Sequence, residues 1–445
     1  MRGPADLGVV EAAAALQDRR VSSRELCDSC LARIAERDGR HSADGDSASV
    51  NAWVRVYEEE ARAAAVRADE RLARGDAPTL CGIPIGLKDL YAAAGKPLTA
   101  SNHVLDEEPT RDCEAWARLQ AEGMVLLGHL HTHEFAAGGT TDQVGNPWAL
   151  DRSAGGSSGG SAAALASRTV PAATGTDTAG SLRIPSSMCG TSTIKPTRGL
   201  VPMRGIVPLS PTLDHAGPMA RTVGDCEPLL AAMAGTAAPA ERRPLRRAVV
   251  SPRIAELDPD VAEGFDEAAA ALGADLVPVP PPDAPLDLGR DLLDVVCAEM
   301  LAYHRRFDDR RQLYRQSTRD FLEEGERRAL SAEEYVAIHS RRRELTAVWL
   351  DWFAEHGVDA VVEPTIPLVA RPRGKGYDRA FTDSAEISLT HYWDWTGFPA
   401  VALPSGVGSR SGLPVSVSMI GAPGTDWDLL AWGTALQDEL GAPAP

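Results

Sequence analysis

The chain has 445 residues, of which 44% are hydrophobic and 24% charged, a composition that predicts a globular protein with a large core. Its 63 acidic and 45 basic side chains leave a net charge of −18, which repels phosphate backbones, so we expect no nucleic-acid partner. No apolar stretch is long enough to span a bilayer, so we expect no membrane partner. Seven scattered cysteines without a disulfide framework, and an N-terminus without a secretory signal, favour a cytoplasmic location.

The pattern of residue types along the sequence changes near residue 80. Residues 8–38 and 52–74 carry apolar side chains at helical spacing, which predicts two amphipathic helices, and Ser22 and Glu25 match a capping box within the first. From about residue 80 to residue 235, short β-branched runs alternate with clusters of Gly, Pro, Ser and Thr. This alternation of strand, loop and helix signals is typical of an α/β core.

The second half of the chain predicts a strand–helix–strand unit, a long helical region and a closing set of strands. The expected strands are 247–251, 275–279, 358–362, 399–404 and 413–421, and the expected helices are 261–272, 289–356 and 426–440. We therefore predict a single domain, 1–445. Its segments are N-terminal helices (1–78), a core (79–235), the strand–helix–strand unit (236–288), a helical region placed to cover the site (289–357) and the rest of the core (358–445).

Lys88 stands out among the candidate functional residues. Only four of the 45 basic side chains are lysines, and this one ends the Gly/Pro-framed run 82–88. Two serine-rich loops follow it, at 153–161 and 176–181. Arginine stays protonated in proteins, whereas a desolvated lysine becomes a neutral base. A lysine kept near serine loops therefore indicates proton-transfer chemistry.

Lysine and serine side chains at these positions are able to form a proton relay. A neutral Lys88 accepts a proton from one serine, which in turn accepts the proton of the other. This requires burial to lower the lysine pKa from about 10.4 towards 7. The small residues Thr178, Ala179 and Gly180, ahead of Ser181, leave backbone N–H groups able to face an oxyanion.

Other chemistries are possible for the same loops. Residues 155–159 match G-x-S-x-G, so an esterase that uses Ser157 and a downstream histidine stays open, although a turn rather than a core strand precedes the motif. No Gly-Lys-Ser/Thr follows the glycines, which excludes a phosphate-binding P-loop. His129, His131 and His133 alternate, but no further ligand completes a metal site at a familiar spacing. We expect neither a metal nor an organic cofactor.

Several ordered motifs resemble the amidase signature family. They are Gly82-x-Pro-x-x-x-Lys88-Asp89, Gly-Gly-Ser-Ser-Gly-Gly-Ser at 155–161, and Thr-Asp-Thr-Ala-Gly-Ser-x-Arg-x-Pro at 176–185. Its later motifs resemble the segments 195–199, 213–221, 396–400 and 412–415, so the similarity runs from about residue 20 to the C-terminus. The resemblance implies the amidase signature fold, an α/β architecture in which a large mixed, twisted β-sheet is covered by helices on both sides.

The resemblance also implies a Ser–cisSer–Lys triad. Ser181 would be the nucleophile that forms an acyl-enzyme, Ser157 would relay its proton from an unusual cis peptide, and Lys88 would be the base. Asp177 and Arg183 would brace the loop. The oxyanion hole would be formed by the backbone N–H groups of Thr178, Ala179, Gly180 and Ser181.

The chain departs from the family pattern at three places. Ala179 stands where many members have Gly, and His131 replaces a common Asn. Residues 391–397 read His-Tyr-Trp-Asp-Trp-Thr-Gly where the family often has Asn-Leu-Thr-Gly. The aromatic side chains there either line a substrate pocket or pack in the core. The predicted substrate-binding residues are Phe135, Ala136, Gly138, Tyr392, Trp393 and Trp395.

These features predict an amidohydrolase that converts a small, linear carboxylic amide into a carboxylate and ammonia or an amine. Three alternatives remain: the glutaminase (A) subunit of a tRNA-dependent amidotransferase, an α/β-hydrolase-type esterase, and a non-enzymatic interaction protein on the same scaffold. The acidity of the chain, and the lack of an evident match over 289–356, count against the amidotransferase subunit. A homodimer is compatible with the expected amidase.

Overall fold

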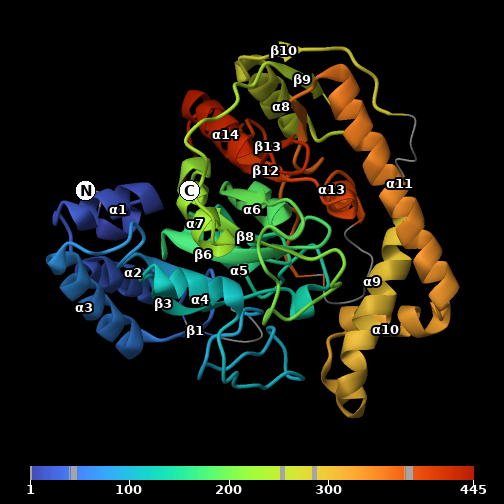
Figure 1. Cartoon of the computed structure of the whole chain (residues 1–445). Coiled ribbons are helices and arrows are strands. Elements are labelled where there is room, and N and C mark those ends of the chain that lie inside the picture. Colours follow the sequence, from blue (N-terminus) through green and yellow to red (C-terminus); the bar gives the residue numbers. More distant parts are fainter. Residues whose placement is uncertain are drawn as a thin grey trace.

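The computed structural model describes residues 3–39, 41, 48–250, 256–282, 288–374, 376 and 384–445. Its centre is a mixed sheet of 11 strands in the order β1-β3-β2-β6-β8-β7-β12-β13-β11-β9-β10 (Figure 1). Helices surround this sheet, and a long helical arm, drawn in yellow to orange, lies at one side of the molecule. The predicted fold class, a large mixed sheet with helical cover, is confirmed.

The N-terminal segment is more divided than its hydrophobic pattern predicts. The expected helix over 8–38 is two helices, separated where Arg19 has a left-handed backbone (φ 57°), and Ser22 caps the second in the predicted capping box. The expected helix over 52–74 begins late, because its first residues form an edge strand that pairs antiparallel with β3. The elements are η1 (Pro4–Asp6), α1 (Val9–Gln17), α2 (Ser23–Arg37), β1 (Trp53–Val56) and α3 (Glu58–Arg74).

The strands that carry the candidate site lie in the middle of the sheet. Strands β3, β2 and β6 are parallel neighbours, and β8 and β7 continue the sheet antiparallel. Every residue of β2, β6, β7 and β8 is buried, so both faces of the sheet are covered there. The bounds are β2 (Pro84–Lys88), β3 (Val125–Leu130), β6 (Ala172–Asp177), β7 (Ser192–Lys195) and β8 (His215–Ala220).

The C-terminal half completes the sheet beyond β7. Strand β12 pairs antiparallel with β7, and β13, β11, β9 and β10 follow. The predicted strand–helix–strand unit and the three later strands are confirmed: β9 (Arg247–Val250), α8 (Pro259–Ala271), β10 (Asp275–Leu276), β11 (Ala360–Pro364), β12 (Ala400–Val407) and β13 (Pro414–Ile420). A separate two-stranded ribbon, β4 (Gly145–Asn146) with β5 (Ala149–Ser153), precedes the first serine loop, where the sequence predicts only a turn.

Two short helices pack on the central strands; one begins within the first serine loop and the other directly after the second. They are α5 (Gly159–Ala166) and α6 (Arg183–Cys189). The glycines of the first loop permit close packing, since a Cβ at Gly160 would lie 2.5 Å from the backbone N of His131. The helices α4 (Glu114–Ala121), α7 (Val223–Ala234) and α14 (Asp426–Leu440) complete the cover of the core.

The predicted helical region over 289–356 is confirmed as the arm at the side of the core (Figure 1). Its elements are α9 (Gly289–His304), η3 (Arg305–Leu313), α10 (Gln316–Arg328) and α11 (Ala332–His356). Trp349 of α11 docks on α13 (His391–Thr396), which follows the one-turn helix α12 (Ser384–Ile387). The Trp349 indole N–H donates to the Tyr392 hydroxyl at 2.6 Å, and the ring of Trp349 lies 5.1 Å from that of Trp393.

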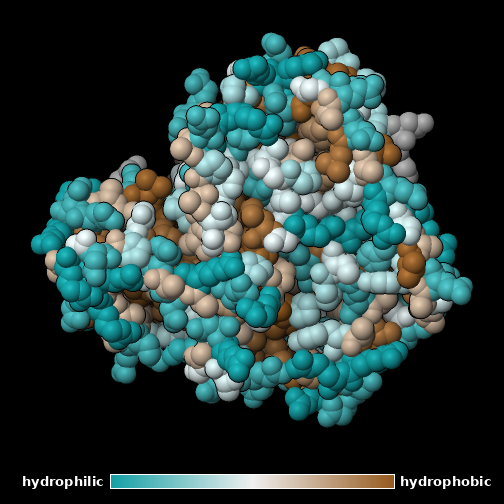
Figure 2. Space-filling model, viewed as in Figure 1, coloured by the Kyte–Doolittle hydropathy of each residue, from teal (hydrophilic) through white to brown (hydrophobic). Residues whose placement is uncertain are grey.

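The surface is mainly polar. Figure 2 shows hydrophilic residues over most of the visible face, with apolar residues in separate small groups. Within the described parts of the chain, no helix combines the length and the apolar character needed to cross a membrane.

Candidate active site

Lys88 lies at the carboxyl end of β2, fully buried between two neighbouring loops. Its Nζ atom is 2.7 Å from the Ser157 Oγ, 2.8 Å from the Ser158 Oγ and 2.8 Å from the Thr176 Oγ1. Its backbone N–H donates to Thr174 Oγ1 of the parallel neighbour β6. The carboxyl ends of β2 and β6 therefore bring the lysine and both loops together at one edge of the strands.

Burial determines the protonation of this lysine. Removal from water lowers the pKa of Lys88 to about 7, although the negative charges of Asp177 and Asp214 act in the opposite direction. Among the described residues, the hydrogen-bond partners of the Nζ atom are all neutral hydroxyl groups. A protonated lysine donates to these hydroxyls, whereas a neutral one accepts the O–H of Ser157, so the contact serves both states.

The loop that carries Ser157 is held by its backbone. The Gly156–Ser157 peptide bond is cis, as the family resemblance predicts. The Ser157 carbonyl accepts the His133 N–H at 2.9 Å and the Thr141 hydroxyl at 3.1 Å. Gly156 packs against the backbone of Thr140, where a Cβ would lie 2.3 Å from the carbonyl oxygen. The position of the Ser157 side chain is thus fixed from both sides of its peptide.

The second loop carries Ser181, which is 7% exposed. Asp177, at the end of β6, lies beneath this loop: one carboxylate oxygen accepts the Gly180 N–H, and the other accepts the Leu182 N–H at 3.2 Å. The Arg183 Nε donates to the same carboxylate at 2.9 Å. Burial penalises the Asp177 carboxylate, yet the Arg183 guanidinium outweighs it and holds the pKa of Asp177 below its ordinary value.

These contacts divide the predicted oxyanion-hole residues into two groups. The Gly180 N–H is already engaged by Asp177, so Gly180 contributes its backbone shape (φ 135°) rather than a free donor. Among the described residues, the N–H groups of Thr178, Ala179 and Ser181 have no acceptor within hydrogen-bond distance. The two loops also meet directly, because the Ser158 N–H donates to the Ser181 carbonyl at 3.3 Å.

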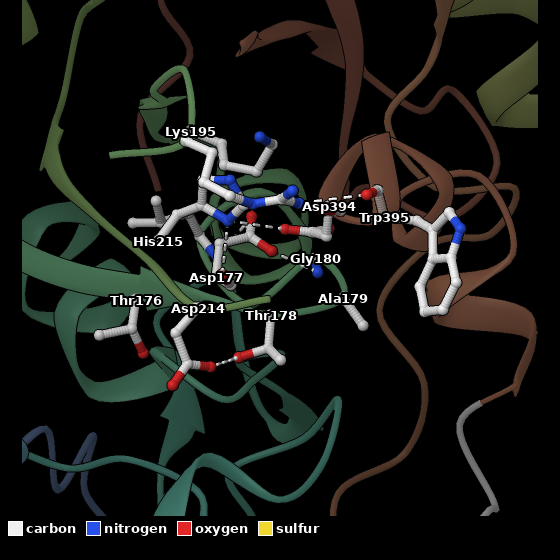
Figure 3. Close-up of polar contacts among 12 residues, drawn as sticks. Thr176, Asp177, Thr178, Ala179, Gly180, Lys195, Asp214, His215, Asp394 and Trp395 are labelled. Carbon is white, nitrogen blue, oxygen red and sulfur yellow. Dashed lines mark hydrogen bonds and ion pairs between the residues drawn. The ribbon is translucent and has the colours of Figure 1, made fainter. Parts of the chain in front are cut away.

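Asp214 supports the start of the second loop. The Thr178 hydroxyl donates to its carboxylate at 2.6 Å (Figure 3). The Leu209 and Ser210 N–H groups donate to it as well. Burial raises the pKa of Asp214 to about 7, against the effect of these hydrogen bonds.

The predicted substrate-binding residues lie in two places, and all of them except the half-buried Gly138 are buried. Phe135 and Ala136 belong to the 3-10 turn η2 (Glu134–Ala136). This turn directly follows His133, whose N–H donates to the Ser157 carbonyl. Phe135 packs on the arm, 4.4 Å from the His304 ring, and Gly138 packs against the ring of His133. Tyr392, Trp393 and Trp395 lie in α13 with at most 1% of their surface exposed, in the hydrophobic core. Their contact with a substrate stays a prediction.

The side chains of two motif histidines, His129 and His215, contact groups other than a catalytic serine. His129 lies 2.8 Å from the Tyr57 hydroxyl and 3.0 Å from the Tyr91 carbonyl. His215 contacts the Asp177 carbonyl at 3.3 Å. In the described part of the chain, no three His, Cys, Asp or Glu side chains are grouped as metal ligands, and the side-chain partner of Ser157 is Lys88 rather than a histidine.

A buried charged cluster behind the Ser181 loop is the feature that the sequence did not predict. Asp394 of α13 is 2.5 Å from the Arg183 Nη2, and His215 and Lys195 lie beside it (Figure 3). Burial lowers the pKa of Lys195 to about 7. In the sequence, the only sign of this cluster is a single charged residue, Asp394, within the aromatic run 391–397. Its partner Arg183 is 211 positions away, so the sequence does not indicate the contact.

Comparisons with known proteins show the family to which the chain is related. A family model described as Amidase matches residues 41–430. The A subunit of glutamyl-tRNA(Gln) amidotransferase from Roseiflexus sp. (strain RS-1) is 35% identical in an alignment of 480 positions. The alignment covers 97% of this chain and 96% of that protein. The A subunit from Thermotoga maritima has a solved structure with a TM-score of 0.76 and 26% identity, covering 98% of this chain and 96% of that one.

A second solved structure is similar over 99% of this chain and 100% of its own, with a TM-score of 0.87 and 30% identity. It is described as part of an unexpected vestigial protein complex that reveals the evolutionary origins of an s-triazine catabolic enzyme.

These relatives correct one expectation. The prediction of a small-molecule amide as the sole partner, with no nucleic acid, is wrong, because the relatives are subunits of an enzyme named for glutamyl-tRNA(Gln). The prediction relied on the net charge of −18, which is a property of the whole surface. Nucleic-acid binding depends on local patches and, in an enzyme of several subunits, on the other chains, so net charge does not decide it.

Proposed function

The chain belongs to the amidase family and is an enzyme of the amidohydrolase type, and we propose that it cleaves a carboxamide through an acyl-enzyme on Ser181. The observation that carries the proposal is the contact of 2.7 Å between the Lys88 Nζ and the Ser157 Oγ, in a loop bonded to that of Ser181. A buried lysine with a pKa of about 7 is half neutral near pH 7, as a base must be.

The proposed reaction has two stages. Lys88 accepts the proton of Ser157, Ser157 accepts the proton of Ser181, and the Ser181 Oγ attacks the amide carbonyl carbon. The negative oxygen is stabilised by the N–H groups that have no protein acceptor, including those of Ala179 and Ser181. The relay returns a proton to the leaving nitrogen, the C–N bond breaks, and ammonia or an amine departs. Water then cleaves the ester by the same relay and releases the carboxylate.

We further propose that this chain is the glutamine-hydrolysing A subunit of a tRNA-dependent amidotransferase. Support comes from its 35% identity to a protein of that name over nearly the whole length of both chains. In this role the amide is the side chain of glutamine, the acyl-enzyme is a γ-glutamyl ester of Ser181, and the ammonia is consumed by an acceptor on tRNA. The helical arm over 289–356 is then part of the A subunit, and it no longer argues against this assignment.

Labelling with a serine-directed fluorophosphonate tests the chemistry without knowledge of the amide. Intact mass should show one adduct on the wild type, none on Ser181→Ala, and slow formation on Lys88→Ala and Ser157→Ala. Ser161→Ala is a matched control, because Ser161 lies in the same serine run but bonds to the Thr174 carbonyl at 2.8 Å. Labelling that survives in Ser181→Ala but not in Ser157→Ala would refute the proposal and support an esterase.

Ammonia release tests the assignment as a subunit. The chain is purified from its own cells under mild conditions and assayed with glutamine, with and without the proteins and tRNA that accompany it. Glutaminase activity that rises on addition of those proteins and glutamyl-tRNA supports the A subunit. Full hydrolysis of other carboxamides by the isolated chain would instead indicate an independent amidase. This second candidate is favoured by the TM-score of 0.85 to a solved structure described as an amidase, against 0.76 to an A subunit.

A further inference from the structure

We propose that Asp394 is a positioning residue for the Ser181 loop, acting from α13 through the Arg183 guanidinium and the Asp177 carboxylate. The inference rests on the proposed function, since it concerns the N–H groups that would stabilise the oxyanion. It adds a residue from the C-terminal part of the chain to a site whose three triad candidates lie between positions 88 and 181.

The path from Asp394 to the loop consists of three buried ionisable side chains. Asp394 is 2.5 Å from the Arg183 Nη2, and the same nitrogen is 3.2 Å from Asp177, which also accepts the Arg183 Nε at 2.9 Å. Asp177 in turn holds the N–H groups of Gly180 and Leu182, the residues on either side of Ser181. A rotation of the guanidinium would therefore move the backbone on both sides of the nucleophile. Asp394 opposes that rotation by binding the same Nη2 atom that faces Asp177.

A second contact from the same segment reaches the loop directly. The Thr390 hydroxyl donates to the Ala179 carbonyl at 2.5 Å, and the Thr390 carbonyl accepts the Arg183 Nη1 at 3.1 Å. Gly180 lies so close to Thr390 that a Cβ there would be 2.3 Å from the Thr390 Oγ1. The segment from Thr390 to Asp394 thus contacts the Ser181 loop at its backbone and at its bracing arginine.

The position of Asp394 is itself fixed by the core. Both Asp394 and Arg183 are buried, with exposed fractions of 0% and 1%. The backbone carbonyl of Asp394 accepts the Arg198 guanidinium, and the Trp395 carbonyl accepts the Arg342 Nε of α11 at 2.6 Å. Figure 3 shows Asp394 directed towards Asp177, with the Thr178–Asp214 contact below them in the view. Because these contacts fix the Asp394 end of the path, a lost contact should appear as a displacement of the Ser181 loop.

The test is the rate constant for fluorophosphonate labelling of Ser181 in the full chain, with thermal unfolding of each variant. The phosphonyl oxygen of the adduct occupies the place of the oxyanion, so the rate reports the geometry of the loop. Asp394→Ala should lower the rate constant about 10- to 100-fold, because a small misplacement of oxyanion donors has effects of this size. Asp394→Asn keeps an oxygen that accepts from Arg183, so it should stay within about threefold of the wild type.

Two further variants separate positioning from general stability. Asp260→Ala is the matched control: this buried Asp contacts Arg410 at 3.1 Å in a distant hairpin, so its loss should lower the unfolding temperature without changing the labelling rate constant. Thr390→Val keeps the volume but loses the bond to Ala179, and should slow labelling about 3- to 10-fold. If Asp394→Ala does not fold, a slow Thr390→Val with a near-wild-type Asp394→Asn still supports the proposal.

The outcomes are distinguishable. Rate constants equal to the wild type in Asp394→Ala and Thr390→Val would overturn the positioning role while leaving the Ser181 chemistry in place. A slowdown in Asp394→Asn as large as that in Asp394→Ala would also overturn it, because the accepted hydrogen bond would then not matter. A wild type that is not labelled at Ser181 would overturn the proposed function and this inference together.

Discussion

The pH dependence of Ser181 labelling follows from the burial of Lys88. Burial lowers the lysine pKa to about 7, so the charged form predominates below that pH and the neutral base above it. The fluorophosphonate rate constant should therefore rise with pH, be half-maximal near pH 7, and fall about tenfold for each pH unit below it. At pH 5, we expect about one hundredth of the plateau rate. Above pH 8 the rate should be constant, since further deprotonation of Lys88 has no effect.

The assay is intact-protein mass followed over time at fixed reagent concentration, from pH 5 to pH 9. Lys195 is the necessary control, because burial also lowers its pKa to about 7. In Lys195→Met the acid limb should persist with its midpoint near 7, whereas Lys88→Met should label slowly at every pH. A flat wild-type profile over this range would refute the reasoning. A limb that disappears in Lys195→Met would show that Lys195, rather than Lys88, is responsible for it.

Three other predictions concern stability and loop geometry. Lys88→Met should raise the free energy of unfolding at pH 7 by about 1–3 kcal/mol in urea titrations. The shift of the Lys88 pKa from 10.5 to about 7 means that the buried lysine destabilises the folded chain by about 5 kcal/mol, and the hydrogen bonds lost in the variant offset part of this gain. The sign follows from linkage: the unfolded chain binds more protons between about pH 7 and 10.5, so wild-type stability should rise with pH in that window, and the variant should lose this rise. Gly180→Ala should slow Ser181 labelling about 10- to 100-fold, because its φ of 135° and its contact with Thr390 leave no room for a Cβ; an unchanged rate would refute the loop geometry. Trp349→Phe should lower the free energy of unfolding by about 1–3 kcal/mol, since it removes the indole donor to Tyr392; an unchanged urea midpoint would contradict the docking of α11 on α13.

The sequence located the catalytic candidates because each belongs to a local motif. Lys88, Ser157 and Ser181 all lie within runs of Gly, Ser, Thr or Pro whose composition is unusual, and the structure brings Lys88 and Ser157 into contact. The fold class was also predictable, since strand and helix signals alternate in order along the chain.

Features that depend on distant contacts were not predictable. Trp53–Val56 has the apolar spacing of a helix, yet pairing with β3 makes it a strand, so tertiary contact overrides local pattern. Asp394 shows no local signal of its ion pair with Arg183, because the two residues meet only once β12 has joined β7. The partner prediction failed for a similar reason, since a sum of charges contains no information about where those charges lie.

The order of strands in the sheet has a consequence for the biogenesis of the enzyme. Strand β7 lies between β8 and β12, and α13 comes immediately before β12 in the chain. A nascent chain on the ribosome therefore contains Lys88, Ser157 and Ser181 about two hundred residues before it contains the segment that holds the Ser181 loop. No fragment ending before residue 407 includes the whole of β12 as a neighbour for β7. The active site should thus be assembled only at the end of synthesis, and the protein should resist division into an active N-terminal half.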